Sequence, residues 1–464
     1  MNILLILNTL ARVLVIFAMP SLLCALWAFG NDKYQQASLF IIVVVVALVS
    51  AAMLFVAAPR QSGKAGSKET VWFLIITWLS ISSLSSIPFL IVTEGRLILA
   101  LFEAVSCTTT TGASLVSPDT ALSASLLAWR GWLHIFGAVL SISGMMMLLA
   151  QSGRSDTGVF LLRARTIGIS FRLSSFARLF LTVGGLLVGM LVFCFAVLVT
   201  DGLSVREAFA LSAGAITTGQ IVPYDVGEQV ASRWTGIFLS LVLLLACVNS
   251  GLLLSIPRNF SRSVWDHETV GICVAFLCLA ALLSFSQPDV NVPTIISEAA
   301  SVVSSSGMMI SGNKIETVGI PILIFFGFTG GSAISATGGM KMFRMRLLMS
   351  RAVHEFERLS HPQAVMKWHA DREGHSVSTI MAVWVYLVGF AVVAAGLAGF
   401  LSVIGLDFGE ALLVSVGAVT NSAALFRPEL LGDYHHALTQ LILIFSMIFG
   451  RLELLILISL VFRA

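Results

Sequence analysis

FEAVSCTTTTG, residues 102–112, is the first of four related stretches in this chain. Each stretch joins a Glu-Ala pair to a short apolar run and then to a loop of small, mostly hydroxyl-bearing residues; the others are residues 207–219, 298–307 and 410–422. Four such units suit a pseudo-fourfold cation filter, because backbone carbonyls must replace the water that an ion leaves behind. The predicted filter residues are Thr110, Thr111, Gly112, Thr217, Thr218, Gly219, Ser305, Ser306, Gly307, Thr420, Asn421 and Ser422.

The composition excludes a soluble domain, since 57% of the 464 residues are hydrophobic and only 11% are charged. A membrane-spanning helix needs about 20 consecutive, mostly apolar residues. Shorter apolar pieces suit re-entrant half-helices that lead into the four loops; these are residues 98–111, 204–218, 292–306 and 407–421. Ten stretches are long enough to span: residues 4–29, 37–58, 70–92, 126–150, 176–200, 234–256, 269–286, 317–340, 377–404 and 438–461.

We therefore predict an all-α polytopic membrane protein. Two N-terminal transmembrane helices precede four span, pore loop, span repeats around a central pore, and the third repeat contains a Gly-rich intramembrane loop and a basic cytoplasmic segment. The predicted boundaries are residues 1–68 for the N-terminal pair and 69–165, 166–262, 263–360 and 361–464 for the repeats.

Most of the 27 Lys and Arg residues fall on one side of the predicted spans. Short cytoplasmic loops collect such residues, so we expect a bacterial cytoplasmic (inner) membrane protein with both termini in the cytoplasm. All four re-entrant loops then enter from outside. The net charge of +3 restates this bias and gives no support for nucleic-acid binding.

Cysteine and histidine spacing argues against a structural disulfide or a metal site. The six cysteines lie mostly within spans and lack CxxC spacing, and no histidine has an i, i+4 partner. No span carries a nucleophile and base pair or a metal-ligand set. An enzyme is therefore the least favoured class.

Two roles remain open for Glu103, Glu207, Glu298 and Glu410. Each is predicted near the start of a half-helix, where an acidic side chain complements the helix dipole. Direct coordination of an ion is the alternative. The capping role is the favoured interpretation.

Residues 329–339, TGGSAISATGG, interrupt the eighth predicted span. Each glycine costs a helix nearly 1 kcal/mol relative to alanine, and broken backbone at membrane depth survives only inside protein or beside water. A flexible gate under the filter is the favoured interpretation, and a packing kink is the alternative. The predicted gate residues are Gly330, Gly331, Gly338, Gly339, Lys341 and Arg451.

Arg451 is predicted in the middle of the last span. An arginine there costs at least about 2.5 kcal/mol on insertion scales, so it should face the bundle interior. It could pair with Glu453 or another carboxylate, or it could stand below the filter as an electrostatic barrier to ions.

Residues 102–112, 329–341 and 450–453 closely resemble motifs of the TrkH/KtrB/HKT superfamily of potassium transporters, and the similarity extends over essentially the whole chain. The resemblance implies K+ as the transported ion, a homodimer with one pore per subunit, and a cytosolic TrkA/KtrA-like nucleotide-binding regulatory subunit. The basic segments 341–372 and 154–178 would be its docking surface. This chain has no phosphate-binding Gly motif in either segment, so we expect it to bind no cofactor itself.

The chain departs from that family in two loops. The third has Ser304, Ser305 and Ser306 where threonines are usual, and the fourth has Ser422 and Ala423 where a glycine is expected. In the plant branch of the superfamily a serine at one filter glycine accompanies sodium passage. A side chain there would change the size and field strength of one quarter of the carbonyl ring. We therefore expect relaxed selectivity between K+ and Na+.

Three functions are compatible with these patterns. The leading one is K+ uptake driven by the membrane potential, through the filter and past the gate. The second is a proton- or sodium-coupled potassium symporter, which needs an ionisable group at the midplane, and Glu453 is the one candidate. The third is a non-conducting regulatory paralogue.

Overall fold

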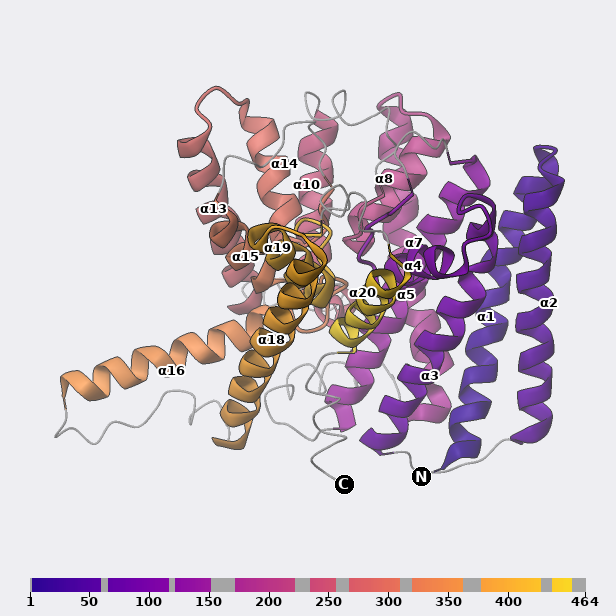
Figure 1. Ribbon diagram of the computed structural model, residues 1–464, viewed down its shortest axis with the longest axis horizontal. Coiled ribbons are helices and arrows are strands. Elements are labelled where there is room, and N and C mark those ends of the chain that lie inside the picture. Colours follow the sequence, from indigo (N-terminus) through magenta and orange to yellow (C-terminus); the bar gives the residue numbers. More distant parts are fainter. Residues whose placement is uncertain are drawn as a thin grey trace.

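The computed structural model describes residues 2–59, 66–116, 122–151, 172–221, 234–255, 267–308, 319–361, 377–426 and 436–452. Every regular element in these ranges is a helix. The helices pack into one bundle, from which a single helix, α16, extends sideways (Figure 1). The prediction of an all-α protein with many apolar helices is confirmed.

The N-terminal pair consists of α1 (Ile3–Gly30) and α2 (Tyr34–Ala57), which lie side by side at one edge of the bundle (Figure 1). Rings from both helices pack on one indole of α5 (Ala124–Gln151): the centroids of Phe17 and Phe40 lie 5.7 and 5.5 Å from that of Trp129. Trp129 Nε1 donates a hydrogen bond to Ser85 O at 3.3 Å. The pair is thus anchored on the helices that follow it.

After this pair, a long helix, a short helix, a loop and further helix recur four times. The first set is α3 (Ser67–Ser85), η1 (Ile87–Ile91), α4 (Leu97–Thr108) and α5 (Ala124–Gln151). The second is η3 (Leu173–Ser175), α7 (Phe176–Thr200), α8 (Val205–Thr217), α10 (Trp234–Cys247) and α11 (Ser250–Ser255). The third is α13 (His267–Ser286), α14 (Val292–Val303), α15 (Ile320–Thr329) and α16 (Met342–Ser360). The fourth is α18 (Val377–Ile404), α19 (Phe408–Thr420) and α20 (Ala437–Arg451). The exact repeat boundaries remain predictions.

Seven helices of the described chain are long and apolar enough to cross a membrane. The four short helices α4, α8, α14 and α19 are not, because each has only 12 or 13 residues. These are the half-helices expected from the sequence, and their ends lie within three residues of the expected ones. The seven long segments are Ile3–Gly30, Tyr34–Ala57, Ser67–Ile91, Ala124–Ala150, Leu173–Thr200, His267–Ser286 and Ile380–Ile404.

Two predicted spans are interrupted. The break after Thr329 was expected, but the break that divides residues 234–256 into α10 and α11 was not. Its cause is a contact with the Gly-rich loop: Ser332 N donates to Cys247 O at 2.9 Å, and Ser250 N donates to Ile334 O at 2.8 Å. Backbone groups that lack a helical partner at the α10–α11 break are thereby paired with backbone groups of the Gly-rich loop, as buried backbone polar groups require.

The helix α16 carries the first part of the basic segment 341–372 away from the bundle (Figure 1). Its exposed face also bears large apolar side chains, among them Phe356 and Leu359. Of the expected docking surface, residues 362–372 and 154–171 lie outside the described residues, whereas residues 173–178 form η3 and the start of α7.

Candidate ion filter and gate

The four loops after the half-helices share one backbone turn. In each, one non-glycine residue has a left-handed φ between 53° and 61°; these are Thr110, Thr218, Ser305 and Asn421. The amide of the next residue then donates to the carbonyl five positions earlier, at 2.9 to 3.0 Å; the bonds run from Thr111 to Ser106, Gly219 to Gly214, Ser306 to Ser301 and Ser422 to Gly417. The loops can therefore be matched residue by residue.

This match differs from the one that glycine spacing suggested. The position after each of those amides is occupied by Gly112, Gln220, Gly307 and Ala423 in turn. Gly112 and Gly307 have φ of 81° and 63°, whereas Gln220 and Ala423 have no positive φ. Gly219, which the spacing placed with Gly112, lies one position earlier in the turn. Two of the four equivalent positions therefore lack glycine.

The loops form a closed ring of neighbours. A Cβ added to Gly112 would lie 2.3 Å from Gln220 N, and one added to Gly307 would lie 2.4 Å from Ala423 C, so the first loop meets the second, and the third meets the fourth, at backbone contact. Two side-chain contacts close the ring: the Met308 side chain after the third loop lies against Gly214 near the end of α8, and Asn421 Nδ2 of the fourth loop donates to Thr111 Oγ1 of the first at 3.0 Å. The ring order follows the chain order, with glycine and non-glycine positions alternating.

The Gly-rich loop, residues 330–341, covers one side of this ring. Gly339 N donates to Thr420 O at 2.8 Å, and Gly338 N donates to Ser305 Oγ at 2.9 Å. Thr110 Oγ1 donates to Ala336 O at 3.5 Å. The Gly-rich loop thus directly contacts the first, third and fourth of the four loops.

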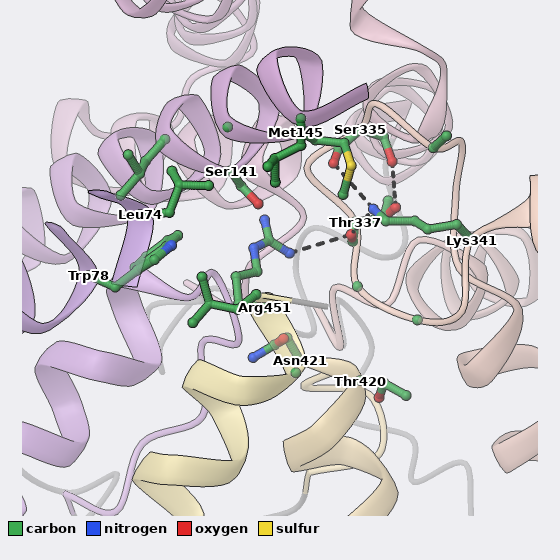
Figure 2. Close-up of a pocket in the computed structure, with 18 residues that line it drawn as sticks. Leu74, Trp78, Ser141, Met145, Ser335, Thr337, Lys341, Thr420, Asn421 and Arg451 are labelled. Carbon is green, nitrogen blue, oxygen red and sulfur yellow. Dashed lines mark hydrogen bonds between the residues drawn. The ribbon is translucent and has the colours of Figure 1, made fainter. Parts of the chain in front are cut away.

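Two buried cations, Lys341 and Arg451, also hold the Gly-rich loop. Lys341 Nζ donates to Thr337 O at 2.6 Å and to Ser335 O at 3.3 Å. Arg451 donates to Ala336 O at 2.6 Å and to Thr337 O at 3.4 Å, so both side chains converge on Thr337 (Figure 2). Arg451 faces the interior, as expected; its suggested partner Glu453 lies outside the described residues.

A cavity of about 40 Å³ lies between these cations and the surrounding helices (Figure 2). Its walls include Trp78 of α3, Ser141 of α5, Asn421 of the fourth filter loop and Arg451. One water needs about 10–15 Å³, so the cavity has room for only a few water-sized ligands.

Comparisons with known proteins agree with this architecture. No protein-family model matches the chain. The Trk system potassium uptake protein TrkH of Vibrio parahaemolyticus is 25% identical over 457 residues, covering 94% of this chain and 92% of TrkH. TrkH of Escherichia coli strain K12 is 24% identical over 458 residues with the same coverage, and TrkI of Halomonas elongata is 26% identical over 372 residues, covering 75% of this chain and 72% of TrkI.

The homologues are Trk-type potassium uptake proteins. They are transporters, which is a non-enzymatic function. The crystal structure of the potassium transporter TrkH from Vibrio parahaemolyticus superposes with a TM-score of 0.80 at 22% identity, over 99% of this chain and 98% of that one. The chain therefore has the TrkH fold.

The four glutamates do not all cap half-helices. Glu207 and Glu410 lie in the first turns of α8 and α19. Glu103 and Glu298 lie in the middle of α4 and α14, where both are buried. The capping prediction is therefore wrong for these two, because a carboxylate beyond the first turn is too far from the open amides to complement them.

Sequence reasoning missed two charged residues, one that contacts α4 and one that contacts the Gly-rich loop. Arg130 of α5 lies 3.5 Å from Glu103. Glu268, in the first turn of α13, accepts hydrogen bonds from Ser332 Oγ and, at 3.2 Å, from Ala333 N. The available signal was a charge beside or within a predicted span, since a charge in the membrane is costly in free energy and usually marks a functional contact.

Proposed function

We propose that this chain carries monovalent cations, principally K+, across the cytoplasmic membrane through the ring of four loops. The observation that carries this proposal is the closed set of neighbour contacts among four half-helix termini that share one turn. Half-helix C-termini direct the negative ends of their dipoles toward the ring. The potassium uptake function in the relatives' names supports K+ as the ion.

The Gly-rich loop is the proposed gate. It lies against the ring and is held by Lys341 and Arg451, whose charges would also repel a passing cation. Opening would require its carbonyls to leave those side chains. The membrane potential would drive the ion inward with about 2.3 kcal/mol per charge per 100 mV.

The proposed assembly is a homodimer with both termini in the cytoplasm and a TrkA/KtrA-like nucleotide-binding regulatory subunit beneath it. The relatives' names place them in a Trk system, which implies more than one component. The basic helix α16, which leaves the bundle, supports a contact surface on that side.

Two residues of the ring support the proposal that the chain discriminates weakly between K+ and Na+. Gln220 and Ala423 stand where Gly112 and Gly307 stand in the other two loops. Side chains and negative φ in half of the ring give its carbonyls two different geometries, and cation selectivity depends on the size and field strength of the carbonyl site.

The test is ion flux into proteoliposomes that contain the purified chain, with K+ or Na+ as the permeant ion. We expect flux of both ions from the unmodified chain and a higher K+/Na+ flux ratio from Ala423→Gly. Ser422→Gly, at the neighbouring position, is the matched control and should change the ratio less. Absence of flux, together with failure to restore growth of a potassium-uptake-deficient strain, would favour a non-conducting paralogue.

A further inference from the structure

The carboxylate of Glu103 is buried in the middle of α4 and is not a helix cap. One oxygen, Oε1, accepts hydrogen bonds from Ser114 Oγ at 2.9 Å, Leu115 N at 2.8 Å and Val116 N at 3.4 Å. The other, Oε2, lies 3.1 Å from Ser114 Oγ and 3.5 Å from an Arg130 nitrogen. A single side chain thus collects three donors from one short segment.

That segment, residues 113–116, immediately follows Gly112 in the first filter loop and is called the limb of that loop below. A second bond ties the same limb to α4, since Ser106 Oγ donates to Ala113 O at 2.5 Å. The limb is therefore fixed to the half-helix from Ala113 to Val116. Gly112 itself has a left-handed φ and no side chain to restrict it, so its conformation depends on what holds its neighbours.

The ion pair between Glu103 and Arg130 explains how a carboxylate can be buried in the bundle. Glu103 is 1% exposed and Arg130 is 8% exposed. An isolated buried carboxylate would be strongly unfavourable, and pairing with a cation together with hydrogen bonding offsets that cost. Leucine would avoid the buried charge but would leave the donors of Ser114, Leu115 and Val116 without this acceptor, so the carboxylate is tied to the conformation of that segment.

The ring positions supply an independent pattern. Nine residues before Gly112 and Gly307 the chain has Glu103 and Glu298, both buried. Nine residues before the other two ring positions it has Leu211 and Val414, also buried. A buried carboxylate therefore accompanies each ring glycine and is missing from the two loops whose ring residue has a side chain.

We propose that Glu103 is a positioning residue for the filter, which holds the limb after Gly112 and thereby fixes that quarter of the ion site. The role rests on the proposed cation conduction through the ring. Glu103 need not touch the ion, because the bonds to Leu115 and Val116 restrict the backbone that does. Loosening them alters how tightly and how selectively the ring holds an ion, with less effect on the number of folded pores.

The experiment compares Glu103→Gln with Glu207→Gln in the full-length chain in proteoliposomes. Glu207 belongs to the same Glu-Ala pattern but caps α8, where its Oε2 accepts from Ser204 N at 3.0 Å. The readouts are the apparent KM for K+, the maximal flux, and the relative flux of Na+, K+, Rb+ and Cs+. Size exclusion and thermal unfolding report whether each variant folds.

For Glu103→Gln we expect an apparent KM for K+ raised about three- to tenfold, the effect of about one net hydrogen bond, and a flatter order of ion preference. Glu207→Gln should leave both unchanged. Ser114→Ala removes one donor while keeping the ion pair, so it should shift KM in the same direction by less, and it serves if Glu103→Gln does not fold.

Unchanged KM and ion preference in Glu103→Gln or, if that variant does not fold, in Ser114→Ala would overturn the positioning role while leaving conduction intact. Equal changes in Glu207→Gln would overturn it as well. A wild-type chain that conducts no cation at all would instead refute the proposed function.

Discussion

The half-helices α4 and α14 on one side, and α8 and α19 on the other, use the same Glu-Ala pair in different ways. In α8 and α19 the N-terminus is capped by a side chain: Ser204 Oγ accepts from Glu207 N at 3.3 Å, and the Asp407 carboxylate accepts from Gly409 N at 3.0 Å. In the described structure the N-caps of α4 and α14, Arg96 and Asn291, make no such bond. Their glutamates lie deeper.

The difference is one helical turn. Glu103 and Glu298 precede the left-handed residue of their loops by seven positions, whereas Glu207 and Glu410 precede theirs by eleven. Four residues are about one turn of helix, which moves the carboxylate from the capped end to the buried middle. The same Glu-Ala dipeptide therefore has a different structural role when its distance from the left-handed residue of the loop changes.

The largest expected effect is a difference in stability between variants of two Arg-Glu pairs that have the same N to O distance. Arg130 and Glu103 are 3.5 Å apart and buried, and Arg96 and Glu94 are 3.5 Å apart with side chains 70% and 81% exposed. Arg130→Met should destabilise the protein by about 3–5 kcal/mol, because it leaves a buried charge unpaired. Arg96→Met should cost about 0–1 kcal/mol.

Thermal unfolding of the purified variants in one detergent measures this difference. Equal shifts in the two melting temperatures would show that burial of the first pair does not matter. The double variant Arg130→Met, Glu103→Gln should recover part of the loss, since it removes both charges and keeps a side-chain oxygen that can accept from Ser114 and Leu115.

A smaller effect on stability, but a clear one on flux, is expected from exchanging side chains at the ring. Gly112→Ala should abolish conduction, because a left-handed φ costs an L-residue about 1–2 kcal/mol and the new Cβ would lie 2.3 Å from Gln220 N. Gln220→Gly should keep conduction, because glycine adopts negative φ without strain. Flux in proteoliposomes decides the matter, and wild-type flux from Gly112→Ala would contradict the assigned register.

The sequence was sufficient for the features that local composition controls. Apolar length fixed α4 and α8 to within three residues at each end, and the density of glycine located the end of α15 at Thr329. The interior position of Arg451 followed from the cost of a charge in the membrane. Each of these depends on a few neighbouring residues only.

Other features depend on partners that are distant in the chain. The break between α10 and α11 is stabilised by Ser332 and Ile334, more than 80 residues further on. Glu103 obtained its role from Arg130 on another helix. The register of the loops is set by left-handed residues such as Thr218, whose conformation no composition rule reveals, so alignment on Gly219 was one position off.

The smallest expected effect tests the other side of the comparison, the capped half-helices. Ser204→Ala removes the oxygen that accepts from Glu207 N at the start of α8. Loss of an N-cap typically costs about 1 kcal/mol, within a range of about 0.5–2, so the melting temperature should fall slightly. The apparent KM for K+ and the order of ion preference should stay at wild-type values, because the cap lies at the end of the half-helix remote from the ring. A shift in ion preference as large as that of Glu103→Gln would mean that any loosening of a half-helix disturbs the filter. The positioning role of Glu103 would then not differ from that of a helix cap.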